Sequence, residues 1–141
     1  MSQDIRWIQR FEQYKKAFNN LRDAVEINKT KSLTKLEEQG LIKTFELVHE
    51  LSWLLIKDFY QSQGDVSIQG SRDAIRLAFK RGLIENGEAF MKSIKTRQLS
   101  VHTYNEETAE KIHHDIINIY YDEFRGLLEK FAQLEKEESG R

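Results

Sequence analysis

The chain has 141 residues, no cysteine, no proline and a formal net charge of -1 from 22 basic and 23 acidic side chains. Without cysteine it can form neither disulfides nor thiolate metal sites, and a cytoplasmic location is favoured. The sequence contains neither a signal-peptide pattern nor a stretch near the roughly 20 apolar residues of a membrane span, so we expect no membrane association. The missing proline removes the commonest helix breaker and favours an all-α chain.

The charges are unevenly distributed along the chain. Residues 1–70 are neutral, residues 71–104 carry seven basic against three acidic side chains, and residues 105–141 carry five against ten. The near-neutral total argues against a protein coated with positive charge for general nucleic-acid binding. The positive excess in the middle fits a local phosphate site, and an ordinary solvated helix surface explains it at least as well.

Two long helices are expected in the first half of the chain. Apolar residues spaced three and four apart predict a helix from about Asp4 to Ile27, followed by a polar loop at residues 28–33. Thr34 and Glu37 form a capping box, which predicts a second helix that runs to about Gln63. The middle of this helix is apolar around most of its circumference, so we place it at the centre of the fold.

Two shorter helices come next. The loop at residues 64–70, which has glycine at both ends, precedes a helix that Ser71 caps and that continues through Lys80 to a stop at Gly82. Its inward residues are predicted to be Ile75, Ala78 and Phe79. A fourth helix covers about Gly87 to Arg97 or beyond, with Phe90, Met91 and Ile94 as its apolar residues.

The last predicted helix begins after Asn105, which can cap it. One apolar stripe extends along it: Ile112, Ile116, Tyr120, Phe124, Leu127, Phe131 and Leu134. We assign residues 1–134 to a single helical-bundle domain and residues 135–141 to a charged tail that frays. The sequence therefore predicts an all-α, up-and-down helical bundle of about five helices.

Arg97, His102 and Tyr104 lie within eight residues between the last two helices. Arginine offers a permanent forked positive charge suited to phosphate, and histidine can transfer a proton near neutral pH. On one continuous helix the first two side chains would lie about 140° apart. Either the helix ends between them and the chain turns His102 back, or the pair spans a wide cleft that a second copy completes. In an extended connection Tyr104 would point to the same side as His102. The plainer alternative is that Arg97 and His102 cap helix-end carbonyls.

Two Glu-x-x-His pairs raise the remote alternative of a di-iron carboxylate bundle. The six residues concerned are Glu46 with His49, Glu110 with His113, and Glu12 and Glu88 as further ligands. The phase of the second helix argues against this site, because Glu46 and His49 fall on its most polar stripe, whereas ligands of a core metal must point inward. His113 and His114 are adjacent, so on a helix their side chains diverge and cannot bind one metal ion without distortion. We therefore predict no metal and no cofactor.

Aromatic residues gather on two predicted faces, one around Trp7 and Phe11 and one around Tyr120 and Tyr121. Dimerisation would bury these faces if a monomer cannot cover them. The alternative is that they are scattered surface aromatics without a role.

The pattern Arg-x4-His-x-Tyr at Arg97, His102 and Tyr104 resembles the signature of HEPN-domain proteins. It is most similar to the small partner subunits of minimal nucleotidyltransferases, described as nucleotidyltransferase substrate-binding proteins or HepT-like toxins. The chain departs from the family at Gln98, where a shorter polar residue, commonly asparagine, is usual; the longer side chain bears on catalysis more than on fold. Further similar segments cover nearly the whole chain: Arg6-Trp7, Arg10-Phe11, Tyr14, Phe45-Glu46, Glu50-Leu51, Trp53, Lys57-Asp58, Gly82-Leu83-Ile84 and His102-Thr103-Tyr104.

The resemblance implies a homodimer whose signature stretches face each other, and a separate minimal nucleotidyltransferase chain as partner. The first function that it implies is a non-catalytic subunit that binds this partner and a substrate or nucleotide, as part of a two-component nucleotidyltransferase or a toxin–antitoxin pair. Arg97 and His102, with Lys95, would bind the substrate, while Gln98 and Tyr104 would serve binding or modification. We prefer this function because a net charge of -1 provides no broad RNA-binding surface.

The alternative function implied by the resemblance is a metal-independent ribonuclease toxin with RNA as its ligand. His102 would handle the proton of the ribose 2'-hydroxyl, and Arg97 would stabilise charge on the phosphate. The partner would silence the toxin by attaching adenylate to Tyr104, which would bring negative charge beside Arg97 and fill the cleft.

Overall fold

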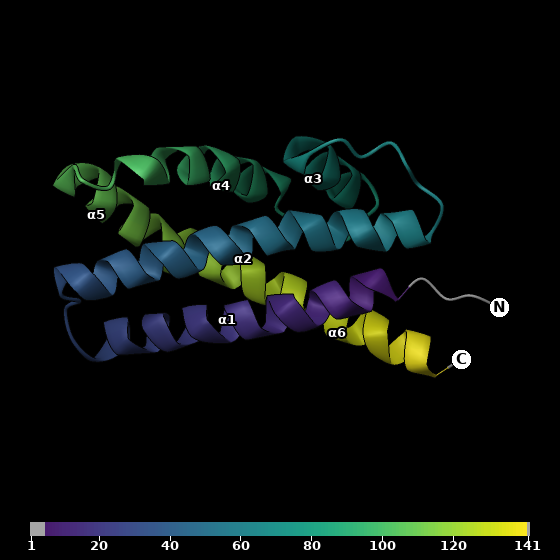
Figure 1. The fold of residues 1–141 in the computed structure, drawn as a ribbon, viewed down its shortest axis with the longest axis horizontal. Coiled ribbons are helices and arrows are strands. Elements are labelled where there is room, and N and C mark those ends of the chain that lie inside the picture. The colour runs from purple at the N-terminus through teal and green to yellow at the C-terminus, as the bar shows by residue number, and fades with distance from the viewer. Residues whose placement is uncertain (1–4, 141) are drawn as a thin grey trace.

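The computed structural model describes residues 5–140, and every regular element in this range is helical (Figure 1). This confirms the predicted all-α helical fold. The elements are α1 (Arg6–Thr30), α2 (Lys35–Ser62), α3 (Ser71–Lys80), α4 (Gly87–Leu99), the 3-10 turn η1 (Ser100–His102), α5 (Glu106–Asp115), the π-helical segment η2 (Ile116–Tyr120) and α6 (Tyr121–Ser139). Within this range, no helix has the length and apolar character needed to cross a membrane.

The second helix, α2, lies at the centre of the fold, as predicted. It packs against all the other α-helices, with α1 antiparallel beside it and α3 and α4 along another side (Figure 1). The predicted capping box starts it: the Thr34 side chain accepts from the Glu37 amide, and the Glu37 carboxylate accepts from the Thr34 amide at 2.9 Å. Several of its apolar side chains are fully buried: Leu41, Phe45, Val48, Leu55 and Ile56.

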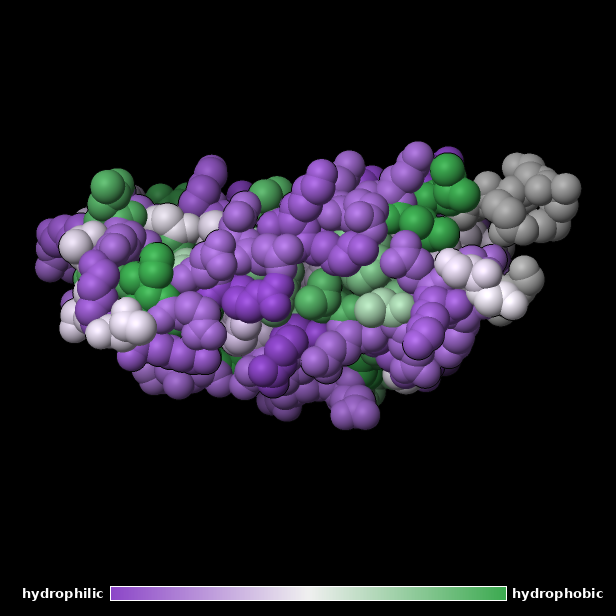
Figure 2. Space-filling view, turned by 90° about the horizontal axis from the view of Figure 1, so that it is seen from below, coloured by the Kyte–Doolittle hydropathy of each residue, from purple (hydrophilic) through white to green (hydrophobic). Residues whose placement is uncertain are grey.

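Aromatic side chains join α1, α2 and α6 in one continuous core. The Tyr14 hydroxyl donates to the Phe124 carbonyl at 2.8 Å, and Phe45 stacks on Tyr120 with ring centroids 5.4 Å apart. Trp7, Phe11 and Tyr120 are no more than 3% exposed. No dimer is needed to bury these three side chains, because helices of the same chain cover them. The face on the α1 side is mostly hydrophilic, with small separate apolar areas (Figure 2).

Two predicted helix ends differ from the structure in the first half of the chain. Asp4, the predicted start of the first helix, lies outside the described residues, and α1 continues to Thr30 rather than stopping at Ile27. The Thr30 hydroxyl bonds to the Ile27 carbonyl, so a polar side chain stabilises the last turn that was expected to be a loop. At α3, Gly70 occupies the cap position without a side-chain bond, and Ser71 is already helical.

Phe79 was predicted to point inward and is instead 55% exposed. The buried face of α3 consists of Ala74, Ile75 and Ala78, and Phe79 lies beyond its edge, with its ring against Gly87. The stop at Gly82 is as predicted: its φ of +77° is the left-handed conformation that glycine adopts without strain.

The last predicted helix corresponds to α5, η2 and α6, which follow one another without an intervening loop. Asn105 caps its start by accepting from the Thr108 amide at 3.1 Å. The apolar stripe is buried as far as Phe131. Helix α6 continues to Ser139, so residues 135–139, expected to fray, are helical here. Glu135 lies 3.9 Å from Lys15 on α1, a contact that supports this turn.

Candidate functional site

Helix α4 positions Arg97 and ends before His102. The Asn86 side chain caps its first turn by accepting from the Ala89 amide at 3.0 Å. At the other end α4 tightens into η1, where the Ser100 amide bonds to the carbonyls of Thr96 and Arg97. Of the two arrangements considered from the sequence, the structure has the helix end between Arg97 and His102.

Arg97 is held against α2 by a carboxylate. Its Nη1 atom lies 3.2 Å from Oε2 of Glu46 and 3.1 Å from the hydroxyl of Ser100. That hydroxyl in turn donates to the same Glu46 oxygen. The Arg97 side chain is 38% exposed and that of Glu46 is 17% exposed. The guanidinium is therefore anchored on one side while part of it still reaches solvent.

This role of Glu46 was not predicted from the sequence, where the residue was proposed as a metal ligand and belongs to a segment similar to the family. The partners Glu46 and Arg97 are separated by 51 positions, so no local spacing connects them. The one available signal was the spacing of three between Arg97 and Ser100, which brings their side chains to the same helix face.

An open groove lies beside Arg97, between α2 and α4. Its volume is about 390 Å³, and its lining residues are Lys43, Thr44, Glu46, Leu47, Glu50 and Arg97. Leu47 is 51% exposed, although α2 is the central helix. The groove therefore combines an anchored arginine, a lysine, two carboxylates and an exposed apolar side chain.

His49 lies behind this group and is only 3% exposed. Its Nδ1 atom is 3.1 Å from the hydroxyl of Ser93 on α4, and its ring stacks on Phe45. Burial, helped by the positive charge of Arg97, lowers the pKa of His49 to about 4. The prediction that His49 lies on a solvated polar stripe is wrong, because α4 packs across that side of α2.

His102 and Tyr104 contact each other on the surface. The Nδ1 atom of His102 lies 3.0 Å from the Tyr104 hydroxyl, and the two rings meet edge to face. They share one side through a turn at Thr103, and not through the extended connection considered from the sequence. Tyr104 is 82% exposed. In residues 5–140 no hydrogen bond joins His102 to Arg97, whose side chain is directed to Glu46 instead.

Lys95 and Gln98 are exposed on α4. Neither side chain has a hydrogen bond or ion pair within the described part of the chain. The structure therefore brings Arg97 together with Glu46 and Ser100, and His102 together with Tyr104, while Lys95 and Gln98 are left facing solvent.

The residues considered for a di-iron site have other partners or face solvent. His113 lies 2.7 Å from Glu38 and 2.8 Å from the Asn28 side chain, and His49 is bonded to Ser93. Glu12, Glu88 and Glu110 are exposed. Among residues 5–140, no three histidine or carboxylate side chains gather with the geometry of a metal site.

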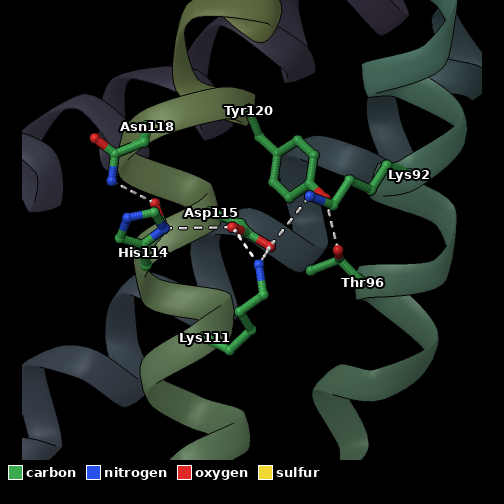
Figure 3. A network of polar contacts seen from close by, with 7 residues as sticks. All are labelled: Lys92, Thr96, Lys111, His114, Asp115, Asn118 and Tyr120. Carbon is green, nitrogen blue, oxygen red and sulfur yellow. Dashed lines mark hydrogen bonds and ion pairs between the residues drawn. The ribbon is translucent and has the colours of Figure 1, made fainter.

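A buried carboxylate links α5 to α4, the two helices on either side of the His102 turn (Figure 3). Asp115 is 4% exposed and accepts from Lys111 at 2.8 and 2.9 Å, while Lys92 of α4 lies 3.8 Å away. Burial alone would raise the pKa of Asp115, but Lys111, His114 and Lys92 together hold it below its ordinary value. Next to it, the hydroxyls of Thr96 and Tyr120 lie 2.6 Å apart. These contacts fix the angle between the two helices that carry the turn.

A family model described as "Nucleotidyltransferase substrate binding protein like" matches residues 9–133. The chain belongs to this family. The match confirms the resemblance that the Arg-x4-His-x-Tyr pattern and its accompanying segments indicated.

Two Haemophilus influenzae matches fit this assignment to the nucleotidyltransferase substrate-binding-like family, and a Thermus thermophilus structure shares the fold. A Haemophilus influenzae protein described as a probable ribonuclease HepT is 31% identical over 98 residues, which are 67% of this chain and 66% of that protein. The match thus spans just under two thirds of the relative's length. HI0074 of Haemophilus influenzae, whose structure is described as the fold of a substrate-binding domain of a nucleotidyltransferase, has 26% identity and a TM-score of 0.73, covering 85% of this chain and 97% of that one. A crystal structure of a Thermus thermophilus protein shares the fold, with 24% identity, a TM-score of 0.75 and coverage of 83% and 97%.

Proposed function

We propose that this chain is the non-catalytic partner subunit of a minimal nucleotidyltransferase and binds both the catalytic chain and a substrate or nucleotide. The observation that carries the proposal is Arg97, anchored by Glu46 and Ser100 at the edge of a groove. Membership of the nucleotidyltransferase substrate-binding-like family supports it.

Arg97 is suited to an anionic group of the ligand. A guanidinium has five N–H donors, and the contacts to Glu46 and Ser100 use only Nη1. The remaining donors can form charge-assisted hydrogen bonds to phosphate, which are among the stronger polar contacts in proteins. We assign Lys95 and His102 to the same substrate surface, since both are exposed on the segment that contains Arg97.

A homodimer is part of this proposal. Exposed apolar side chains lie on both sides of the site: Leu47 in the groove, and Leu99 and Val101 on either side of Ser100, all more than half exposed. Exposure of these apolar side chains to water is unfavourable, and a second copy of the chain placed over the groove would bury them. The two copies would then bring their Arg97 to Tyr104 stretches together.

The second candidate is a metal-independent ribonuclease, and the contact between His102 and Tyr104 favours it. A hydroxyl 3.0 Å from the imidazole is positioned to orient that ring. Adenylylation of Tyr104 would replace this contact with a phosphodiester and block His102, which is how the partner would silence the enzyme. In this case this chain and the nucleotidyltransferase would form a toxin–antitoxin pair. We place both candidate functions, the partner subunit and the ribonuclease, in the cytoplasm.

One comparison separates the two functions. RNA is incubated with the purified chain and a metal chelator, using the wild type, His102→Ala and Tyr104→Phe, each with and without the nucleotidyltransferase chain and ATP. The subunit function predicts no cleavage in any lane and a stable complex with the catalytic chain. The ribonuclease function predicts cleavage that His102→Ala abolishes and that the partner with ATP silences in the wild type but not in Tyr104→Phe.

Nucleotide affinity provides the second readout. Arg97→Ala should weaken nucleotide binding to the complex by about 1.5 to 3 kcal/mol, the contribution of a charge-assisted hydrogen bond. Arg125→Ala is the matched control, because Arg125 is 52% exposed on α6 and, among residues 5–140, pairs only with the nearby Asp122. If RNA is not cleaved and no complex forms with the catalytic chain, both functions are wrong.

A further inference from the structure

Three cationic side chains form a line along α3. Arg72, Arg76 and Lys80 are spaced four residues apart, and all three are exposed. A step of four residues advances about 6 Å along an α-helix and rotates only about 40°, so the three charges stay on one side. The opposite side of α3, with Ala74, Ile75 and Ala78, is buried in the core. The line therefore faces solvent along the whole helix.

The charge of this line is largely uncompensated. Its only acidic neighbour on α3 is Asp73, which accepts from the Gln69 amide at 3.0 Å and lies 3.5 Å from Arg76. Within the described residues, Arg72 and Lys80 have no hydrogen bond or ion pair. Like charges four apart destabilise a helix by a few tenths of a kcal/mol. Asp73 offsets part of that cost through its contact with Arg76, while Arg72 and Lys80, which have no partner in the described part of the chain, are left for an external anion.

An aromatic ring lies next to the line. Phe79 precedes Lys80 and is 55% exposed. Its ring lies so close to Gly87 that a Cβ atom there would be 3.0 Å from it, so the start of α4 supports one part of the ring. The other part is free to stack with a planar group. Proteins that bind single-stranded nucleic acid combine cationic side chains, which contact the phosphates, with an exposed aromatic ring, on which a base stacks.

We propose that the α3 line, defined as Arg72, Arg76 and Lys80 with the ring of Phe79, docks single-stranded nucleic acid. The even linear spacing favours a linear polyanion over the irregular acidic surface of a protein. The contacts involve phosphates and one base face, so RNA and DNA should bind with similar affinity. Helix α3 lies beside the start of α4 (Figure 1), where Phe79 contacts Gly87, whereas Arg97 is in the last turn of α4. The proposal therefore stands apart from the function assigned to Arg97.

The test measures fluorescence anisotropy of labelled single-stranded RNA and DNA oligonucleotides over a series of salt concentrations. The triple variant Arg72→Gln, Arg76→Gln, Lys80→Gln keeps good helix formers at all three positions. Each lost phosphate contact should lower the slope of log K against log salt by about 0.7, so the triple variant should lower it by about 2. Lys16→Gln, Lys130→Gln, Lys136→Gln is the matched control, because it removes the same charge from exposed positions on α1 and α6.

A single variant tests the ring. Phe79→Ala should weaken binding about 5- to 150-fold, the range measured for loss of one stacked base, while Phe79→Tyr should keep it. If the triple variant does not fold, Phe79→Ala and Arg72→Gln alone still decide the question. The proposal is overturned if the α3 triple variant and the control triple variant lower the slope of log K against log salt by the same amount. It is equally overturned if the α3 variant loses only its affinity for the nucleotidyltransferase chain, which would make the line a protein-docking surface. The α3 triple variant should leave the nucleotide affinity of the complex, which is assigned to Arg97, unchanged, so failure at one site is distinguishable from failure at the other.

Discussion

Glu46 neutralises Arg97 across the α2–α4 contact, with 3.2 Å between the carboxylate oxygen and the guanidinium nitrogen. Since the same carboxylate also accepts from Ser100, it both orients the guanidinium and reduces the positive charge that a ligand meets. An anionic ligand must therefore compete with a carboxylate of the protein itself.

The first prediction concerns this competition. Glu46→Gln keeps an oxygen that can accept a hydrogen bond but removes its charge, so nucleotide affinity should rise roughly 2- to 5-fold, the scale of a partly exposed ion pair. Isothermal titration of the complex with nucleotide measures the change. Glu50→Gln is the control, because Glu50 lines the same groove but bonds to Trp53 instead. Equal effects of the two variants would show that only the general charge of the groove matters.

The second prediction concerns the buried His49. Its pKa of about 4 lies below the ordinary value of 6.5, so between these values the unfolded chain binds the proton more tightly than the folded one. The neutral imidazole thus contributes stability that is complete above about pH 6.5 and is lost as the pH falls toward 4, on the order of 3 kcal/mol. Urea unfolding at pH 7 and pH 4.5 should show a smaller difference for His49→Gln than for the wild type. If the wild type and His49→Gln lose the same free energy of unfolding between pH 7 and pH 4.5, His49 is not held neutral in the folded chain.

The third prediction concerns Asp115. Asp115→Asn removes the charge that Lys111 and Lys92 surround, and should lower the free energy of unfolding at pH 7 by about 1 kcal/mol, since both lysines are partly solvated. The pKa of Asp115 is lowered in the folded state, so its contribution is present above the unfolded pKa and disappears as the pH falls through the folded one. The variant and the wild type should therefore converge once the pH has fallen below the folded pKa of Asp115. A difference that persists there would point to packing instead of charge.

The fourth prediction concerns the core. Phe45 is fully buried between His49, Tyr120 and Phe124, so Phe45→Ala should destabilise by about 3 to 5 kcal/mol. Circular dichroism during thermal unfolding measures this loss. Leu36→Ala, at a position that is 78% exposed on the same helix, should change stability by less than about 0.5 kcal/mol. An unchanged melting temperature for Phe45→Ala would contradict the central position of α2.

The sequence predicts best what depends on neighbouring residues. The Thr34 capping box, the Asn105 cap and the Gly82 stop are all present, because each rests on bonds or dihedral angles within a few positions. It fails where a distant helix decides the outcome. His49 was assigned to solvent because its neighbours on α2 are polar, yet α4 covers it and Ser93 bonds to it.

The candidate site also divides into near and distant contacts. The sequence indicates Arg97, His102 and Tyr104 as a group, and in the structure His102 contacts Tyr104, which is two positions away. The pairing of Arg97 with Glu46 depends on how α2 and α4 pack and could not be obtained from spacing. The π-helical segment also escaped prediction, since apolar residues four apart suit both a regular helix and one with a wider turn.

That segment, residues 116–120, gives the C-terminal helix one place where its length can change. A π turn contains one residue more than the α turn it replaces. Deleting Asn118, which is exposed, should let this turn relax to a regular one, with Phe124 and Phe131 still facing the core. Deleting a residue within α6 would instead rotate everything beyond it by about 100° and expose these rings. Natural insertions and deletions in related chains should therefore collect at residues 116–120 and avoid α6.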